Sequence, residues 1–317
     1  MCGIIGILSN ESVATRVYQG LSRLEYRGYD SAGIATLNET GAIERKRAEG
    51  KLVNLKDKLE TEPLQGKIGI GHTRWATHGG PTERNAHPHA TDKVAVVHNG
   101  IIENYKTLKS GLEGKGHVFK TETDTEAVAH LITDYMNDGL APKEAAFKAF
   151  GRLEGAFALA VLFADHPDMM VGVRQGTPLA LGYGEGEMFL ASDSYALAPF
   201  TRKITFLEDG DRILLTRDAA EISDSKGLPV KREVRVTAQS GANSGKGEYA
   251  HFMLKEIYEQ PSVIGDTLNS FVNPATGKIT FPDDIVATLK AAPRLTLIAC
   301  GTAFYACMVA KYWFEQV

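Results

Sequence analysis

Cys2 places a thiol one residue from the start of the sequence, directly ahead of the apolar run GIIGIL. Removal of Met1 leaves this thiol and a free α-amino group on the same residue. An N-terminal amine has a reference pKa of roughly 7.7 to 8.0, so it can take a proton from the thiol near neutral pH. A thiol activated in this way attacks carbonyl carbon. The position also suits a small buried residue that begins a strand, and position alone leaves both interpretations open.

The dipeptide Asn99-Gly100 lies between two apolar runs in VVHNGIIENY. Asn-Gly in such a setting is the strongest short signal for a hairpin, so the motif taken alone predicts a tight turn. The alternative is an oxyanion hole. In that case the Asn99 side-chain amide and the Gly100 backbone N–H donate to one developing negative oxygen.

Five of the nine histidines gather in and just after the stretch GHTRWATHGGPTERNAHPH: His72, His78, His87, His89 and His98. A metal site is one interpretation. No His-Glu-x-x-His or Cys-x-x-Cys spacing supports it, so we predict no metal.

In the same stretch Arg74 precedes Trp75. A guanidinium fork suits a bidentate carboxylate, and an indole can wall a small pocket. The alternative is a surface arginine beside a core tryptophan.

Two further motifs stand at expected helix starts. In TETDTEAV, Asp124 begins a helix, and Thr123 with Glu126 has capping-box spacing, so the motif alone predicts a cap; an exposed carboxylate there could instead hold a ligand ammonium. The second motif, ACGTAF, separates a strand predicted at 295–300 from a helix predicted at 303–317. Backbone N–H groups at a helix N-terminus bind phosphate, although a lone Gly-Thr is a weak signal. Cys300 and Cys307 fit small buried residues.

The surrounding elements form an α+β pattern. Apolar runs predict strands at 2–8, 32–38, 67–72 and 93–98. Helical spacing predicts helices at 12–28, with Ser12 as N-cap and Gly28 as stop, and at 123–139. From 154 to 236 short strands follow one another, which favours antiparallel pairing in layered sheets.

Composition excludes several classes. Of 317 residues, 43% are hydrophobic and 23% charged, which is ordinary for a chain with a sizeable core. Lys plus Arg number 35 and Asp plus Glu 39, a net charge of −4 without a basic run, so neither nucleic acid nor a membrane is an expected partner. Three scattered cysteines make no disulfide framework and indicate the cytoplasm.

A Gly/Ser-rich linker near residues 237–249 predicts a domain boundary, with one domain at 2–240 and a second part at 241–317. The second part begins with a predicted helix, AHFMLKEIYEQPSVIGDTL, which is followed by one predicted strand and a further helix. A single strand builds no sheet, so we expect the sequence to be truncated and the segment beyond about residue 240 to be easily cut by protease.

Six motifs in this order resemble the isomerising glutamine–fructose-6-phosphate aminotransferases: MCGIIGI, LEYRGYDSAGIA, GHTRWATHG, VVHNGIIENY, TETDTE and KEIYEQP. The first part resembles the class II glutamine amidotransferases, which are N-terminal-nucleophile hydrolases. The resemblance implies a four-layer αββα sandwich followed by the beginning of an α/β sugar-isomerase (SIS) domain.

The resemblance also implies roles for single residues. Cys2 matches the nucleophile, with its own α-amine as base, and Asn99 and Gly100 match the oxyanion pair. Arg74 and Asp124 match the residues that hold the α-carboxylate and α-ammonium of glutamine. Trp75, Thr77 and His78 match a loop that closes over glutamine. Arg27 matches an arginine near the nucleophile, and Thr302 matches a contact to the sugar phosphate. The family usually has Ser after that last Thr, where this sequence has Ala303.

The implied reaction is hydrolysis of L-glutamine through a γ-glutamyl thioester, with ammonia passed to fructose 6-phosphate to give glucosamine 6-phosphate in a complete, homodimeric enzyme. No organic cofactor is implied. Amidophosphoribosyltransferase and asparagine synthetase share the N-terminal Cys-Gly, but TRWATHG and KEIYEQP argue against both. The alternative from another class is a sugar-phosphate-binding protein whose glutaminase fold has lost its activity. The intact set of site residues, Cys2, Asn99, Gly100, Arg74 and Asp124, argues against it.

Overall fold

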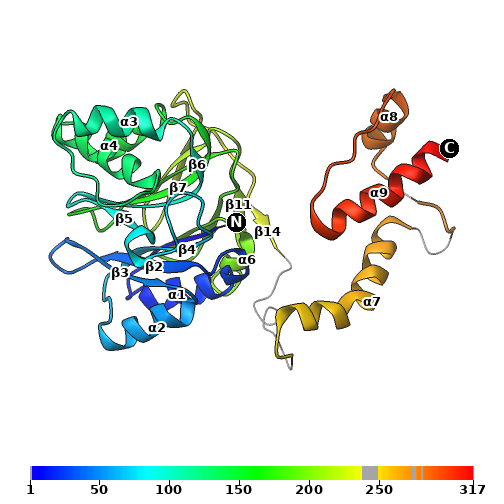
Figure 1. Cartoon of the computed structure of the whole chain (residues 1–317), viewed down its shortest axis with the longest axis horizontal. Coiled ribbons are helices and arrows are strands. Elements are labelled where there is room, and N and C mark those ends of the chain that lie inside the picture. Colours follow the sequence, from blue (N-terminus) through cyan, green and yellow to red (C-terminus); the bar gives the residue numbers. More distant parts are fainter. Residues whose placement is uncertain (1, 238–248, 273–275, 280, 317) are drawn as a thin grey trace. The chain divides into compact units, whose positions relative to one another are not determined.

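The computed structural model describes residues 2–237, 249–272, 276–279 and 281–316. The chain divides into two compact units, residues 1–244 and 245–317, and each is considered by itself (Figure 1). The boundary predicted between residues 240 and 241, and most of the predicted linker, lie outside the described residues.

The first unit is built on two sheets, in which every described strand pair is antiparallel. The eight-stranded sheet has the order β14-β11-β9-β10-β1-β4-β2-β3. Its strands are β14 (Arg235–Val236), β11 (Lys203–Phe206), β9 (Ala180–Tyr183), β10 (Met188–Ala191), β1 (Gly3–Leu8), β4 (Ile68–Arg74), β2 (Ser31–Leu37) and β3 (Ile43–Glu49). The antiparallel pairing predicted from the sequence is therefore confirmed.

The six-stranded sheet has the order β13-β12-β8-β7-β6-β5. Its strands are β13 (Ala220–Ser223), β12 (Arg212–Leu215), β8 (Met170–Gln175), β7 (Gly155–Phe163), β6 (Val94–Ile102) and β5 (His89–Ala90). Although β11 and β12 are close in sequence, they belong to different sheets, and the chain crosses between the sheets through the buried residues Leu207 and Asp211.

Helices cover the outer face of each sheet, and Figure 1 shows the four layers in the order helix, sheet, sheet, helix. The eight-stranded sheet carries α1 (Ala14–Ser22), α2 (Leu52–Thr61) and the short α6 (Ser194–Leu197). The six-stranded sheet carries α3 (Tyr105–Glu113), α4 (Thr125–Asn137) and α5 (Pro142–Phe150). Two 3₁₀ turns, Glu25–Arg27 and Glu83–Asn85, complete the unit. The predicted αββα sandwich is confirmed.

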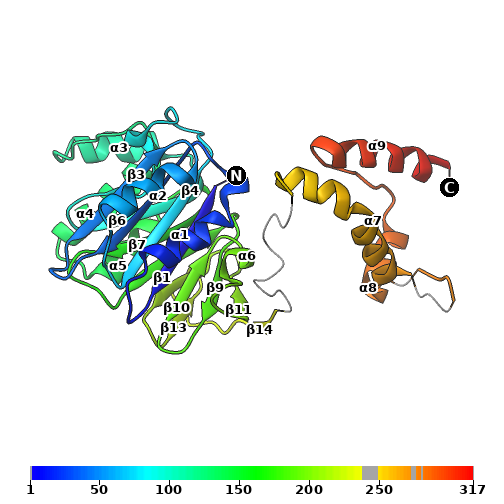
Figure 2. The ribbon, with the colours of Figure 1, turned by 90° about the horizontal axis from the view of Figure 1, so that it is seen from below.

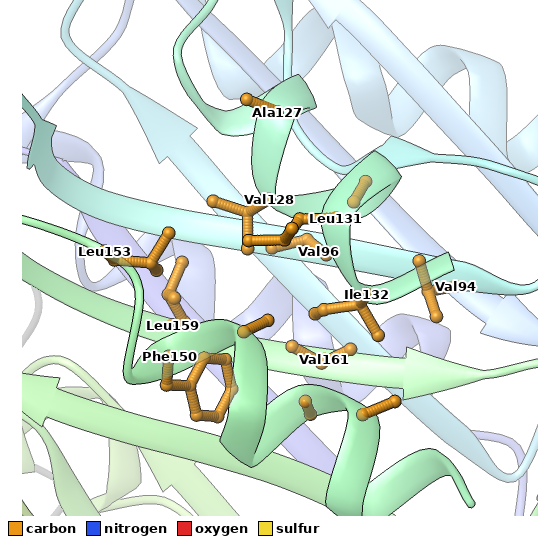
Figure 3. Packing of buried hydrophobic residues seen from close by; sticks show 14 of the residues in the cluster. Val94, Val96, Ala127, Val128, Leu131, Ile132, Phe150, Leu153, Leu159 and Val161 are labelled. Atoms are coloured by element: carbon orange, nitrogen blue, oxygen red, sulfur yellow. The ribbon is translucent and has the colours of Figure 1, made fainter. Parts of the chain in front are cut away.

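Three apolar cores separate the four layers. One lies between the sheets, where Ile4 and Ile70 meet Val97 and Ala160. The second lies beneath α1 and α2, and Figure 2 shows α1 lying along β1 and β4. The third joins the six-stranded sheet to α4 and α5 (Figure 3). Burial of each large aliphatic side chain contributes roughly 1.5–3 kcal/mol to the free energy of unfolding. These cores therefore hold the two sheets and their helices in fixed positions relative to one another.

The first predicted helix has a different beginning from the one expected. Its N-cap is Val13, and the Ser12 hydroxyl donates to Leu64 O at 3.3 Å, so the prediction of Ser12 as N-cap was wrong. Helix α1 ends at Ser22, and a 3₁₀ turn then runs to Gly28. Tight packing explains Gly20, because a Cβ there would lie 2.2 Å from Ile5 Cδ1 on β1.

The second unit contains three helices among its described residues: α7 (Phe252–Phe271), α8 (Asp283–Ala291) and α9 (Gly301–Gln316). The strand predicted at 295–300 is absent, because a strand needs a neighbour for its backbone groups and the described part of this unit offers none. Tyr305 and Trp313 on α9 are 67% and 68% exposed. In the described residues, no helix is both long and apolar enough to cross a bilayer.

Candidate active site

The Cys2 thiol lies just ahead of β1, a central strand of the eight-stranded sheet, and is partly buried. The Trp75 backbone N–H donates to Sγ at 3.3 Å, and the thiol faces the Trp75 carbonyl at 3.5 Å. Burial raises the pKa of the Cys2 thiol, although the bond from Trp75 and the charge of Arg74 act in the opposite direction. Its surroundings therefore keep the sulfur protonated, and attack on a carbonyl requires a base.

A narrow cleft gathers most of the residues singled out from the sequence. Its walls come from segments far apart along the chain: the residue before β1, the end of β4 and the loop after it, the middle of β6, and the start of α4. The lining residues are Cys2, Arg74, Trp75, Thr77, His78, His87, His98, Gly100, Thr123, Asp124 and Thr125.

Asn99 and Gly100 do not form the hairpin turn that their sequence alone predicts. Strand β6 continues through both, with Asn99 opposite Ala158 and Gly100 opposite Phe157 on β7. Gly100 has φ +120°, and a Cβ there would lie 2.0 Å from Ala156 O, so only glycine fits. The buried Asn99 amide turns toward the nucleophile, where Nδ2 donates to the Cys2 carbonyl at 3.1 Å.

Asp124 occupies the N-cap position of α4 without capping it through its side chain. Its Oδ2 instead accepts the Ile102 backbone N–H at 2.8 Å, and the side chain is buried at the cleft wall. The capping box with Thr123 is also absent, because the Glu126 carboxylate accepts the backbone N–H groups of Lys120 and Thr121, both at 2.7 Å. The capping interpretation was therefore wrong.

Arg74 is the last residue of β4 and is only 3% exposed. Its Nη1 donates to Gly80 O at 3.0 Å and its Nη2 to Gly79 O at 3.1 Å, with a further bond to His78 O. These bonds brace the loop that follows β4. A guanidinium carries five N–H groups, so three carbonyl partners do not exhaust it.

The loop after β4 presents Trp75 and Thr77 as exposed side chains. Trp75 is 46% exposed and forms a T-shaped pair with Tyr29, with ring centroids 5.7 Å apart. His78 is partly buried and contacts Tyr105 edge to face. The alternative of a core tryptophan is wrong, and so is that of a surface arginine.

Two predicted residues lie elsewhere. Arg27, in the 3₁₀ turn before β2, is paired with Asp193 and donates from Nε to the Tyr26 hydroxyl at 3.0 Å; it does not line the cleft. Thr302 is an exposed residue in the first turn of α9, in the second unit.

Sequence reasoning missed a buried polar network behind the cleft. His98 Nδ1 lies 2.9 Å from Thr125 Oγ1, and the His98 backbone N–H donates to His87 Nδ1 at 3.3 Å. His72 lies 2.9 Å from His98 O and 3.1 Å from Asn99 Oδ1. Burial lowers the pKa of each of these histidines. The only sequence signal was the clustering of histidines, and in the described part of the chain no three ligand-type side chains converge as a metal site would require.

Comparison with known proteins agrees with this geometry. A model of the glutamine amidotransferase domain matches residues 72–199. Glutamine–fructose-6-phosphate aminotransferase (isomerizing) of Brucella suis biovar 1 (strain 1330) is 56% identical over 317 residues, which is 100% of this chain and 52% of that protein. The same-named protein of Zymomonas mobilis subsp. mobilis is 54% identical over 316 residues, again 100% and 52%. The chain thus spans about half the length of the curated relatives it matches.

Among solved structures, glutamine phosphoribosylpyrophosphate amidotransferase from B. subtilis, complexed with ADP and GMP, superposes with a TM-score of 0.61. It is 26% identical, and the match covers 71% of this chain and 49% of that one. The two-sheet sandwich, the cleft at Cys2 and the similarity of this whole chain to half of each aminotransferase lead to one conclusion: residues 72–199 of this chain match a glutamine amidotransferase domain.

Proposed function

We propose that the chain hydrolyses L-glutamine to glutamate and ammonia, with Cys2 as the nucleophile. One observation carries the proposal. Segments that are distant in sequence bring a thiol, a guanidinium and a carboxylate to one cleft, those of Cys2, Arg74 and Asp124. The side-chain amide of Asn99 lies beside them, with Nδ2 bonded to the Cys2 carbonyl. A carboxamide with an α-ammonium and an α-carboxylate is the substrate whose groups match these four.

In the proposed mechanism, Met1 is removed and the Cys2 α-amine takes the proton from Sγ as sulfur attacks the γ-carbonyl carbon. Asn99 Nδ2 and the Gly100 N–H donate to the oxyanion of the tetrahedral intermediate. The ammonium of Cys2 returns the proton to the leaving nitrogen, and ammonia departs from a γ-glutamyl thioester. Water then loses a proton to the amine and attacks the thioester, which releases glutamate and restores the thiol.

Binding is assigned to the two charged residues of the cleft, Arg74 for the α-carboxylate and Asp124 for the α-ammonium. Support comes from burial, because a partly desolvated ion pair discriminates more strongly than an exposed one. The loop with Trp75, Thr77 and His78 is proposed to close over the bound amino acid. Arg74 bonds to three carbonyls of that loop, which couples the loop's conformation to the residue that meets the substrate.

For the whole protein we propose that ammonia passes to fructose 6-phosphate to give glucosamine 6-phosphate, in a cytoplasmic homodimer and without a cofactor. Residues 2–240 would form the glutaminase domain and 241–317 the start of a sugar-isomerase domain, with Thr302 contacting the sugar phosphate. Arg27 would act near the nucleophile. Support comes from the names of the relatives, which this chain matches along its whole length and over 52% of theirs.

The test is a glutaminase assay on the purified chain with and without fructose 6-phosphate, in which glutamate and amino sugar are measured separately. Intact mass establishes whether Cys2 is N-terminal. We expect glutamate release that Cys2→Ala abolishes and that Cys2→Ser nearly abolishes, because a hydroxyl is the poorer nucleophile. Absence of glutamate release from protein that lacks Met1, or turnover by Cys2→Ala within about tenfold of the parent, contradicts the assignment.

A further inference from the structure

His72 lies on β4, in the middle of the eight-stranded sheet, and is fully buried. Its ring reaches across to β6 in the other sheet. There Nε2 lies 2.9 Å from the His98 backbone carbonyl and 3.1 Å from Asn99 Oδ1. His72 does not line the cleft, so any effect it has on the reaction must pass through Asn99.

The contact with a backbone carbonyl determines where the His72 proton lies. A carbonyl oxygen only accepts, so Nε2 must carry the hydrogen. The Asn99 atom that faces this N–H must then be an acceptor, which makes it Oδ1 and not Nδ2. Nδ2 is consequently turned toward Cys2, where it donates one hydrogen to the Cys2 carbonyl at 3.1 Å and keeps the other for a ligand.

The opposite tautomer is unfavourable on two counts. It would set the Nε2 lone pair against two oxygens, and it would leave an N–H on Nδ1, a buried atom with no partner among the described residues. Burial lowers the pKa of His72 to about 3, so the ring is neutral at physiological pH and carries one hydrogen. The His87 ring stacks on it at 4.1 Å with 14° between the planes, which holds the ring orientation.

We propose that His72 is a positioning residue for the oxyanion hole: its Nε2–H holds the Asn99 amide with Nδ2 directed at the reacting carbonyl. A flipped amide would present Oδ1 to the developing oxyanion, and a repulsive contact would replace a stabilising one. The inference rests on the proposed glutaminase function and acts only through Asn99.

A matched pair of variants isolates the hydrogen-bond donor. In glutamine, Nε2 is separated from Cα by the same number of bonds as Nε2 of histidine, so His72→Gln keeps a donor at this point. His72→Met has the same length and ends in a methyl group. We expect His72→Met to lower kcat roughly 10- to 100-fold with KM for glutamine nearly unchanged, which is less than the loss of the whole donor. His72→Gln should stay within about threefold of the parent.

Two further measurements separate positioning from a purely structural role. In an Asn99→Ala background, His72→Met should cause no further loss of kcat, because the amide through which His72 acts is already absent. His89→Met serves as a control, since His89 is as deeply buried in the histidine cluster as His72 but its Nε2 bonds to Thr123 Oγ1 and not to Asn99. ¹⁵N NMR of the parent should find the His72 hydrogen on Nε2.

The outcomes are distinct. Equal kcat for His72→Met and the parent, an additive loss in the Asn99→Ala background, or a hydrogen on Nδ1 overturns the inference while leaving the glutaminase function in place. If His72→Met does not fold, the His72→Gln rates and the tautomer of the parent still decide. A parent protein that lacks Met1 and releases no glutamate refutes the proposed function instead.

Discussion

Removal of the Asn99 amide should slow the chemistry and leave binding almost untouched. The structure gives Nδ2 two hydrogens, one donated to the Cys2 carbonyl and one left for the oxyanion. Asn99→Ala therefore removes one of two proposed oxyanion donors, for which about 2.7–4 kcal/mol, or 10²–10³ in kcat, is the usual cost. KM for glutamine should change little, because the amide does not contact the proposed binding carboxylate or guanidinium.

The fold should tolerate the same change. His72 Nε2 keeps its bond to His98 O at 2.9 Å, so the main bond that is lost is the one from Nδ2 to the partly buried Cys2 carbonyl. One such loss costs about 1–3 kcal/mol of unfolding free energy. Steady-state glutamate release across glutamine concentrations separates kcat from KM, and thermal unfolding monitors the fold.

Asn104→Ala is the matched control for Asn99→Ala. The Asn104 amide also makes two hydrogen bonds, to Arg152 O at 2.8 Å and from the Glu154 N–H at 3.2 Å, but neither of them joins it to Cys2. We expect this variant to lose stability and keep kcat. A large rise in KM for Asn99→Ala with kcat unchanged would refute the oxyanion assignment and make Asn99 a binding residue.

Two further substitutions and a pH series test other parts of the site, and limited proteolysis tests the domain boundary. Asp124→Ala should raise KM by about 10- to 150-fold, the factor that corresponds to 1.5–3 kcal/mol for a bond to a charged group; loss of stability with KM unchanged would limit Asp124 to its structural bond. Gly100→Ala should abolish activity and lower stability, because its Cβ would lie 2.0 Å from Ala156 O at a φ of +120°; normal activity would contradict this backbone geometry. The pKa of His72 is about 3 in the folded chain, below its ordinary value of 6.5, so the unfolded state binds more protons between these values. The unfolding free energy should therefore decrease as the pH is lowered through this range, and a constant melting temperature between pH 7 and 4 would contradict the buried neutral ring. Limited proteolysis should leave a glutaminase-active fragment ending near residue 240, and a chain that resists cleavage there would refute the proposed boundary.

The layers of the fold could be predicted from sequence because each strand and helix carries its own periodicity. The run before Ser9 is buried on both faces, and α4 places Val128, Leu131 and Ile132 in one core. The separation of β11 and β12 into different sheets could not be predicted, because a short loop permits both a hairpin and a crossing. Only the packing of the two sheets on each other decides between them.

At the site, two predictions made from short sequence motifs were wrong because contacts outside each motif decide the structure. Asn99-Gly100 has the composition of a turn, but pairing with β7 keeps it extended. Thr123 and Glu126 have the spacing of a cap, but the Glu126 carboxylate binds the preceding loop. At Asn99-Gly100 a strand distant in sequence overrides the local preference, whereas at Glu126 the competing partners are two backbone N–H groups in the loop just before the helix. The bond from His72 to Asn99 joins two sheets, so no spacing along the chain reveals it.

The most direct test of the proposed chemistry is to identify the covalent intermediate on its residue. Acid quenching of the parent protein during glutamine turnover, followed by peptide mass spectrometry, should find a γ-glutamyl group on the Cys2 sulfur of a peptide that begins at Cys2. The adduct should disappear when glutamine is exhausted and should be absent from Cys2→Ala. Sustained glutamate release with no adduct on Cys2, or with the γ-glutamyl group on another residue, would contradict Cys2 as the nucleophile.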